Sequence, residues 1–304
     1  MYGYVAYRSQ AMRFVTLPFA LAMLAVGLPR LSIAIELQPS TLQAWNDYVR
    51  TADSRMRERV DGPRPFLWAD EAGDRRSRLR QGEILVVPVS GRGTHIVPNG
   101  LIHDWVGAIF IPNASVERFL AVAHDYDRYK DYYRPLVADS KVLACTDQDR
   151  SYSMVWQRRV LFVNAAIEGE YQAHDFAVDG QRGYSITTTT RMQEIEGYGH
   201  SDARLVPPGQ GDGFIWRLHS IVRYEERDGG LYLEMEAIAL TRDIPASLRW
   251  MVKPVVNRLS MDSLLTSLRE TRDAVNRAAG LAGRLVSCAG VSRNSGKAKG
   301  SAAN

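Results

Sequence analysis

Two glutamates are placed where a pair of carboxylates could act together. Glu234 and Glu236 stand two residues apart in a segment of β-type pattern, so both side chains fall on one face of the strand. Such a pair could serve general acid–base chemistry. The turn sequence Asp228-Gly229 predicts a hairpin in which Arg223 lies directly across from Glu234. A structural ion pair is therefore the favoured interpretation.

Arg242 is a second residue with chemical potential, at the junction between the last strand and a long helix. Its guanidinium could hold an anionic headgroup, or it could tie the junction to Asp243, which is the favoured interpretation. The sequence contains no G-x-S-x-G, P-loop or H-E-x-x-H motif. The six histidines form no pair at i, i+4, so we expect no metal site and no cofactor. Arg158-Arg159 is predicted to be a solvated charge run.

Charge and cysteine content narrow the class of protein further. Residues 1–34 carry three arginines and no acid, and residues 281–304 carry four basic residues and no acid, so the body between them is mildly acidic. The basic pI is thus no argument for a nucleic-acid partner, and we expect none.

Cys145 and Cys288 could form one disulfide in an oxidising compartment. One buried strand thiol and one thiol in a tail is the favoured interpretation.

The N-terminus is typical of a secretory signal. Arg13 supplies positive charge, residues 14–28 form an apolar run of the expected length, and Ser32-Ile33-Ala34 offers a cleavage site. An uncleaved anchor is the alternative, although the run is short for a membrane span. We expect an exported protein, periplasmic or secreted after cleavage, whose translation starts at Met1 or Met12.

The pattern predicts four parts: a signal peptide over 1–34, an N-terminal helical extension over 35–82, a ligand-binding domain over 83–280, and a disordered basic tail over 281–304. Helical spacing predicts helices over 39–59 and 70–81. The domain then begins with β-type runs over 83–89 and 101–112 around a turn-rich link, and helices over 115–124 and 126–133 follow. Six β-type segments come next, at 136–145, 152–160, 163–178, 184–195, 213–226 and 231–241. A polar loop over 196–212 separates the fourth from the fifth, and a helix over 245–278 closes the domain.

This order of elements resembles the helix-grip fold of the START-like superfamily, also called SRPBCC, which includes pollen allergens, steroid and phospholipid carriers, and polyketide cyclases. The resemblance covers about residues 100–278, through Ile111-Pro112 leading into the first helix of the domain and Thr241–Trp250 leading into the last. The stretches GFIWRL at 213–218 and LTRDIP at 240–245 are similar to an uncharacterised group of exported bacterial proteins. The resemblance implies an α+β fold: a curved antiparallel sheet of about seven strands wrapped on the C-terminal helix, two extra N-terminal helices, and a cavity between sheet and helix.

The hairpin register also predicts which face of the sheet is inside. It places an apolar set of side chains toward the long helix and the charged set toward water. The apolar side chains become smaller along the hairpin, where Ser220 faces Ala237 and Leu218 faces Ala239. The small residues favour space over packing. The same alternation predicts that ten further residues point inward: Trp105, Ile109, Met154, Trp156, Ile167, Tyr171, Ile186, Thr188, Thr190 and Met192. The predicted ligand-binding residues are Trp105, Met154, Trp156, Tyr171, Thr188, Trp216, Leu218, Met235, Arg242, Val252 and Val255. A solid, dry core is the alternative.

Three functions remain open on the sequence. The first is non-enzymatic binding or transport of a hydrophobic small molecule, lipid-like or aromatic, outside the cytoplasm. The second is an enzyme of the cyclase or dehydratase kind, which requires an ionisable side chain inside the cavity, such as Glu236 or Arg223. The third is an interaction module of the cell envelope with a filled core, making peripheral membrane or envelope contacts. The sequence does not reveal the oligomeric state.

Overall fold

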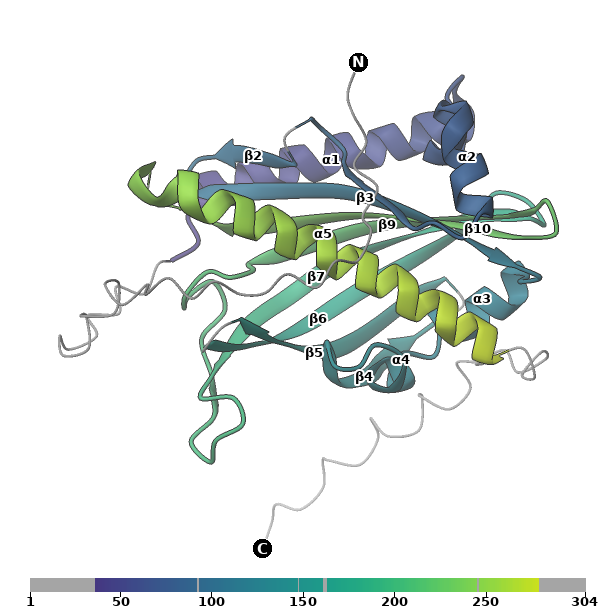
Figure 1. Ribbon diagram of the computed structural model, residues 1–304. Coiled ribbons are helices and arrows are strands. Elements are labelled where there is room, and N and C mark those ends of the chain that lie inside the picture. Colours follow the sequence, from purple (N-terminus) through teal and green to yellow (C-terminus); the bar gives the residue numbers. More distant parts are fainter. Residues whose placement is uncertain (1–35, 92, 147, 161–162, 245, 279–304) are drawn as a thin grey trace, which may run out of the picture. The chain divides into compact units, whose positions relative to one another are not determined.

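The computed structural model describes residues 36–91, 93–146, 148–160, 163–244 and 246–278, without the side chains of 159, 160, 163, 164 and 246–255. The predicted signal peptide and basic tail lie outside these residues. The described strands form one antiparallel sheet with the path β1-β3-β10-β9-β7-β6-β5-β4, while β2 pairs with β3 and β8 with β7 (Figure 1). The strands are β1 (Leu85–Pro88), β2 (Thr94–Val97), β3 (Gly100–Pro112), β4 (Val137–Cys145), β5 (Asp149–Val160), β6 (Val163–Ala177), β7 (Arg182–Glu196), β8 (Arg204–Leu205), β9 (Arg217–Arg227) and β10 (Gly230–Arg242).

The helices lie before, within and after this run of strands. They are α1 (Pro39–Asp61), the short 3₁₀ helix η1 (Trp68–Glu71), α2 (Gly73–Arg80), α3 (Val116–Ala123), the 3₁₀ helix η2 (Tyr126–Arg128), α4 (Tyr129–Tyr132) and α5 (Ala246–Arg277). The sequence of elements from β3 to α5 confirms the predicted helix-grip order. The strand count was wrong, because the described residues form ten strands rather than about seven. The link over 90–100 contains β2, and the loop over 196–212 contains β8.

The β9–β10 hairpin has the predicted register. Asp228 and Gly229 both have positive φ, 56° and 77°, as a two-residue hairpin turn requires. Arg223 lies opposite Glu234, and Ser220 lies opposite Ala237. The turn chemistry alone was sufficient to set the pairing of these two central strands.

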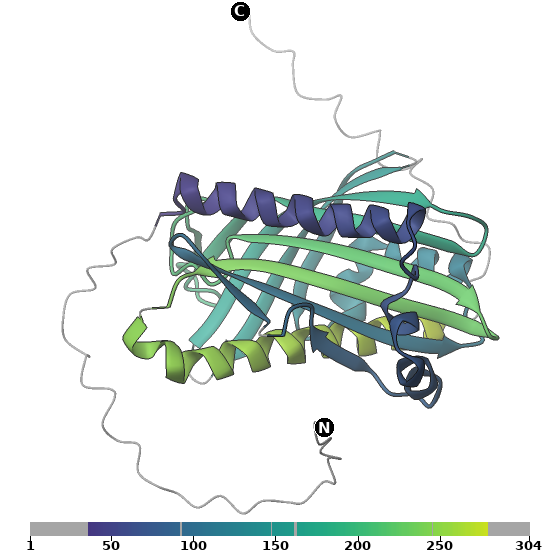
Figure 2. The same ribbon diagram turned by 90° about the horizontal axis from the view of Figure 1, so that it is seen from above.

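Two long helices cover opposite faces of the sheet. Figure 2 shows the strands between α1 and α5. We call the face toward α5 the inner face and the face toward α1 the outer face. On the inner face Ile109, Leu233 and Tyr224 pack in one cluster with Leu264 and Leu268 of α5. On the outer face a second cluster joins strands and α1, through residues that include Ile221, Ile238, Leu240, Trp45 and Met56.

The prediction that the charged set faces water was wrong. Arg223 and Glu234 are 1% and 0% exposed, because α1 and η1 cover them. All of β3 except its last residue is buried, including His103 and Asp104. A strand that is buried on both faces belongs to a sheet covered on both sides. The segment over 35–82 is accordingly part of the same compact unit as the sheet.

Strand β7 changes its phase part of the way along. Glu170 pairs with Arg191 while Tyr171 pairs with Thr189, so Thr190 has no partner and forms a bulge. One extra residue inverts the alternation of faces. Met192 therefore points inward as predicted, but Ile186 packs in the outer cluster and Thr188 bonds to the outer-face His219. The inward assignments of Ile186 and Thr188 were wrong for this reason.

Candidate ligand-binding site on the inner face

The burial pattern of the two central strands marks an open surface under α5. In β9, Leu218, Ser220 and Val222 are partly exposed, although the residues between them are buried. Met235, Ala237 and Ala239 of β10 show the same alternation. All six lie on the inner face. Side chains in the middle of a covered sheet would be sealed if α5 filled the space above them. Solvent therefore reaches these six residues in the space between β9–β10 and α5, which we call the hollow.

Small side chains produce this hollow. Across the ladder, Tyr224 faces Leu233 at the hairpin end, whereas Ser220 faces Ala237 and Leu218 faces Ala239 further along. The large pair packs in a cluster with Leu264 and Leu268 of α5, whereas the side chains of the small pairs are partly exposed. The floor is mainly apolar, with a single hydroxyl group at Ser220. The predicted inward direction of Leu218 and Met235 is confirmed by their clusters.

Strands β5 to β7 continue the inner face as an aromatic and sulfur-rich wall. Met154, Tyr171 and Met192 share a cluster there, and Trp156 packs against it. The Trp156 indole N–H donates to the Tyr171 hydroxyl at 2.7 Å, and that hydroxyl donates to the Met192 sulfur at 3.8 Å. Burial raises the pKa of Tyr171, so the hydroxyl stays protonated. Tyr152 lies on the same face, directly across from Tyr171 on β5, and its ring stacks on that of Tyr171 with 5.1 Å between the centroids.

The opposite end of the inner face is closed by α5. Leu268 lies so close to Gly107 that a Cβ built on that glycine would stand 2.5 Å from the leucine Cδ1. Glycine at this position therefore lets the helix approach β3 directly. Trp105, predicted as a cavity wall, lies in the same cluster as Leu264 and Leu268 and is 8% exposed. Its direction toward α5 is confirmed.

Two polar contacts hold the middle of α5 across the hollow. On the β2 side, the Thr94 hydroxyl donates to the Asn257 side-chain oxygen at 2.9 Å. On the β5 side, Arg158 donates to the Leu259 carbonyl oxygen at 3.2 Å and also contacts the Ser263 hydroxyl. The prediction that Arg158 is merely solvated was wrong. It lies on the same face of β5 as Trp156 and reaches the helix from there.

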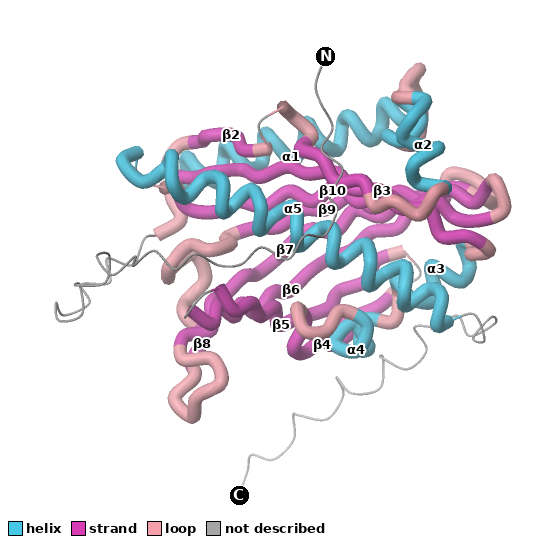
Figure 3. Tube along the Cα trace, in the orientation of Figure 1, coloured by secondary structure: helices cyan, strands magenta, loops and turns pink. Residues whose placement is uncertain are grey.

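The loop between β7 and β9, at the lower left of Figure 3, is fixed by a buried carboxylate. Glu194 is 9% exposed and accepts backbone N–H bonds from Asp212 at 2.7 Å and Phe214 at 2.9 Å. Gly211 has a φ of 104°, and a Cβ there would stand 2.5 Å from the Glu194 Oε2. Sequence reasoning missed Glu194, because one acid at a strand end has no local signature. The Gly-rich composition of the loop was the available signal.

Besides Thr188, four predicted site residues lie elsewhere or outside the described side chains. Trp216 packs in the outer cluster with α1 residues, because it precedes β9 rather than alternating within it. Arg242 follows Leu240 and Ile238 on the outer-face alternation, and its Cβ lies beside Gly213. Within the described residues no ion pair joins Arg242 to Asp243. Val252 and Val255 belong to the part of α5 whose side chains are not described.

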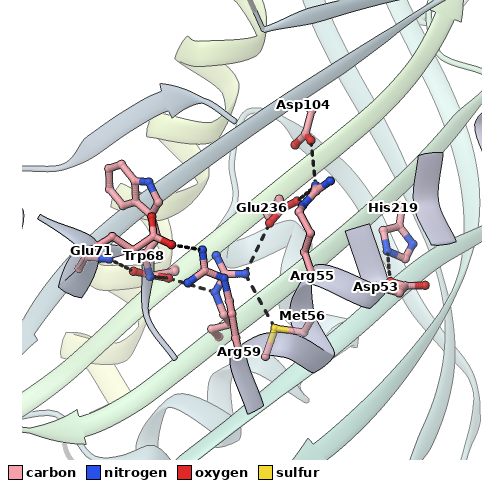
Figure 4. Close-up of polar contacts among 12 residues, drawn as sticks. Asp53, Arg55, Met56, Arg59, Trp68, Glu71, Asp104, His219 and Glu236 are labelled. Carbon is pink, nitrogen blue, oxygen red and sulfur yellow. Dashed lines mark hydrogen bonds and ion pairs between the residues drawn. The ribbon is translucent and has the colours of Figure 1, made fainter. Parts of the chain in front are cut away.

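The ionisable groups discussed for catalysis form a separate layer under α1, shown in Figure 4. Arg55 of α1 binds Glu236 at 2.8 Å and Asp104 of β3 at 3.3 Å. Arg223 binds Glu234 at 3.0 Å and lies 3.5 Å from Glu236. Glu234 also accepts the backbone N–H groups of Trp68 and Ala69, so η1 is anchored to the sheet. The favoured structural ion pair is thus observed, although it is buried rather than exposed.

Asp104 is the residue of this layer whose hydrogen bonding is incomplete. Tyr48 donates its hydroxyl to the Asp104 Oδ2 at 2.7 Å, while the buried Oδ1 has no hydrogen-bond partner among the described residues. Burial, followed by the nearby Glu236 carboxylate, raises the pKa of Asp104 to about 7. Three carboxylates face two guanidiniums here, so a proton on Asp104 relieves the excess of negative charge.

Other kinds of site have little support among the described residues. No group of three or more His, Cys, Asp or Glu side chains is arranged there to hold a metal ion. None of the helices in that part of the chain has the length and apolar character to cross a membrane. A surface pocket of about 580 Å³ beside the β9–β10 turn is open and lined mainly by polar residues, including Gln181 and Glu226.

Cys145, at the end of β4, is in a disulfide, so the free-thiol interpretation was wrong for that residue. Cys288 lies outside the described residues.

Comparisons with known proteins concern the fold. No family model and no curated protein matches the chain. Solved structures similar to it include a STAR-related lipid transfer protein fragment from Xanthomonas axonopodis (16% identity, TM-score 0.40, 60% of this chain and 99% of that chain). The Zhui aromatase/cyclase from Streptomyces (13%, 0.38, 62% and 98%) and human STARD10 (10%, 0.39, 62% and 76%) are also similar.

The arrangement of strands and helix makes the fold START-like, as the sequence resemblance implied. Identities and TM-scores this low say nothing of what the chain binds, so the proposal below rests on its own residues. The similarity to an exported bacterial group stays a prediction.

Proposed function

We propose that this protein binds a hydrophobic small molecule, lipid-like or aromatic, in the hollow between the inner face and α5, without chemical conversion. The observation that carries the proposal is the alternating exposure of β9 and β10. A hollow with an apolar floor and few polar groups is the usual form of a small-molecule site. Each Å² of apolar ligand surface removed from water contributes roughly 25 cal/mol before the costs of association.

We favour a carrier over a cyclase because of where Glu236 and Arg223 lie. The cyclase alternative asks for Glu236 or Arg223 in the cavity, and both lie under α1 on the outer face, tied to other charged groups. The envelope module with a filled core is not favoured by a partly exposed floor. A chemical test separates the first two: a carrier returns its extracted ligand with unchanged mass, whereas an enzyme returns a different molecule.

Filling the hollow tests the binding site directly. Ala237→Phe places a ring over the floor, and the matched control Ala144→Phe makes the same change at an exposed position of β4. The neutral dye N-phenyl-1-naphthylamine serves as the probe, with its fluorescence reporting transfer to an apolar site. We expect wild type and Ala144→Phe to bind it and Ala237→Phe to lose at least 10-fold in affinity, because the ring occupies the ligand volume. Equal binding by both variants, each with wild-type circular dichroism, would refute the site.

Export is part of the same proposal. The apolar run over 14–28 supports it, and so does the disulfide of Cys145, since disulfides persist in oxidising compartments. Expression of the full chain in a bacterial host should yield a periplasmic or secreted product cleaved near residue 34. Intact mass of the exported product tests this, and an uncleaved cytoplasmic product would contradict it.

A further inference from the structure

Two arginines lie close together at one end of the outer face. Arg217 of β9 lies opposite Leu240 of β10, and Arg242 is two residues beyond Leu240 on the same strand. Arg217 alternates with the outer-face Ile221, and Arg242 alternates with Leu240, so both follow the outer face. Diagonal neighbours of this kind have Cα atoms about 7–8 Å apart. Two arginine side chains at this separation can therefore reach one small ligand.

Arg217 is a partly buried cation without an anion. Its Nη1 donates to the Trp216 carbonyl oxygen at 2.7 Å, and no carboxylate among the described residues forms an ion pair with it. Burial lowers the pKa of the Arg217 guanidinium, and no neighbouring acid offsets this effect. Moving a charged group away from water is unfavourable unless an opposite charge accompanies it. The internal contacts of the fold do not supply that opposite charge.

Arg242 is likewise without an ion pair in the described part of the chain. Its stem lies beside Gly213, where a Cβ would stand 2.8 Å from the Arg242 Cβ. The neighbouring Asp243 carboxylate accepts the backbone N–H of Ile244 at 2.8 Å. Asp147 is the one acid whose side chain is not described, and it belongs to the link between β4 and β5, which three strands separate from β10. An anion from outside the protein is the remaining partner.

The N-terminus of α1 adds positive charge at the same end of the sheet (Figure 2). Thr41 of the first turn packs on Gly100, where a Cβ would stand 2.9 Å from the Thr41 Cγ2, and Gly100 is the ladder partner of Arg242. The first turn contains no acid, and the N-cap residue Gln38 makes no side-chain bond to it. A helix N-terminus is equivalent to about half a positive charge. Two guanidiniums and this helix end repel one another unless an anion lies near them.

We propose that Arg217, Arg242 and the first turn of α1 form a binding site for a dianionic phosphate group. Guanidiniums bind phosphate through charge-assisted hydrogen bonds, and helix N-termini favour the same group. Two full positive charges match a dianion better than a single carboxylate. The site is on the face of the sheet opposite the hollow, so it is additional to the proposed function and does not depend on it.

The phosphate group could belong to a soluble molecule or to a lipid headgroup. The second source would bring an apolar surface, and Phe214, which follows Gly213, is 41% exposed. The two sources share the chemistry that the arginines recognise and differ in whether a bilayer must be present. The experiment therefore has one arm for each source.

Isothermal titration calorimetry with inorganic phosphate tests the first source. The full-length chain is titrated at about pH 8, where phosphate carries two charges, with ionic strength held constant by chloride. Arg217→Gln and Arg242→Gln are compared with wild type and with the control Arg64→Gln. Arg64 is exposed and follows the other end of α1, so the control removes the same charge away from the site. Circular dichroism checks that each variant is folded.

We expect each of the two site variants to weaken phosphate binding at least about 10-fold, because each removes charge-assisted hydrogen bonds. Arg64→Gln should bind phosphate as wild type does. Binding of the dye N-phenyl-1-naphthylamine should be unchanged in all three variants, because the hollow lies on the other face. Phosphate binding that is equally strong in wild type and both site variants would overturn the proposal.

Cosedimentation with vesicles tests the second source. Phosphatidylcholine vesicles with and without phosphatidic acid are compared on the same four proteins. Binding that requires phosphatidic acid and both site arginines, without binding of free phosphate, assigns the lipid headgroup. Binding of free phosphate that requires both arginines assigns a soluble phosphate group. If wild type binds neither probe, the phosphate site is overturned while the proposed function, tested by the dye, stands.

Discussion

Replacing Asp104 with asparagine should remove a pH dependence of stability that originates beneath α1. Asparagine imitates the protonated acid: its amide oxygen can accept from Tyr48, and its NH₂ group takes the place of the unpartnered Oδ1. The folded-state pKa of Asp104 is raised to about 7 from an ordinary value of 3.8. The folded protein therefore holds this proton more tightly than the unfolded chain does.

The sign and the magnitude follow from that difference. Stability from this group is fully present below the unfolded pKa of 3.8 and declines as pH rises to about 7, beyond which it is level. The difference of roughly three pKa units corresponds to about 4 kcal/mol in total at about 1.4 kcal/mol per unit. Of this, about 2–3 kcal/mol falls between pH 5 and pH 8.

Urea denaturation of wild type and Asp104→Asn at pH 5, 6, 7 and 8 measures the effect. The variant should gain about 2–3 kcal/mol relative to wild type between the ends of this range, because wild type alone loses stability through Asp104. Asp47→Asn is the control, since Asp47 lies on the exposed side of α1 and should change stability by less than about 0.5 kcal/mol. A difference between wild type and Asp104→Asn that is constant across the pH range would refute the reasoning.

Three further predictions concern the site and its supports. Gly169→Ala should destabilise the fold by about 1–3 kcal/mol in urea denaturation and alter the environment of Trp156, because a Cβ there would stand 2.4 Å from the Tyr171 hydroxyl. Gly180→Ala is the control, because a Cβ at Gly180 meets open space. Equal effects of the two substitutions would contradict the prediction. Arg158→Ala should speed amide hydrogen exchange across 256–263, because α5 loses its contact with β5. Arg134→Ala, at an exposed arginine, should leave this exchange unchanged. Unchanged exchange in Arg158→Ala would show that Arg158 does not hold α5. Unreduced protein should have a mass about 2 Da below that of the reduced protein, because Cys145 is in a disulfide; two alkylatable thiols without reductant would be the contrary result.

The sequence was sufficient for most of the local structure. Elements whose pattern is repeated over many residues, such as β10 and α5, were predicted within a few residues of their bounds. The register of β9 with β10 followed from Asp228-Gly229, because a two-residue turn leaves one pairing. The inward direction of Met154, Tyr171 and Met235 followed from alternation along uninterrupted strands.

The candidate site was only partly predictable for two physical reasons. The bulge at Thr190 adds one residue to a ladder and turns Thr188 and Ile186 to the outer face, and nothing in the local sequence marks that extra residue. Side chains beyond the ends of strands do not follow the alternation, as Trp216 shows. The use of Glu194 to hold a loop likewise depends on two segments meeting in space.

What the sequence by itself determined is the set of strands and helices, their order and the pairing across tight turns, because these depend on neighbours along the chain. What only the tertiary structure decided is what covers each face of the sheet. Charged residues are expected at the surface, but Arg223, Glu234 and Asp104 are buried, because α1, which is far away in sequence, packs over them. Burial is a property of contacts between distant segments, and a single sequence does not state which of its helices will supply them.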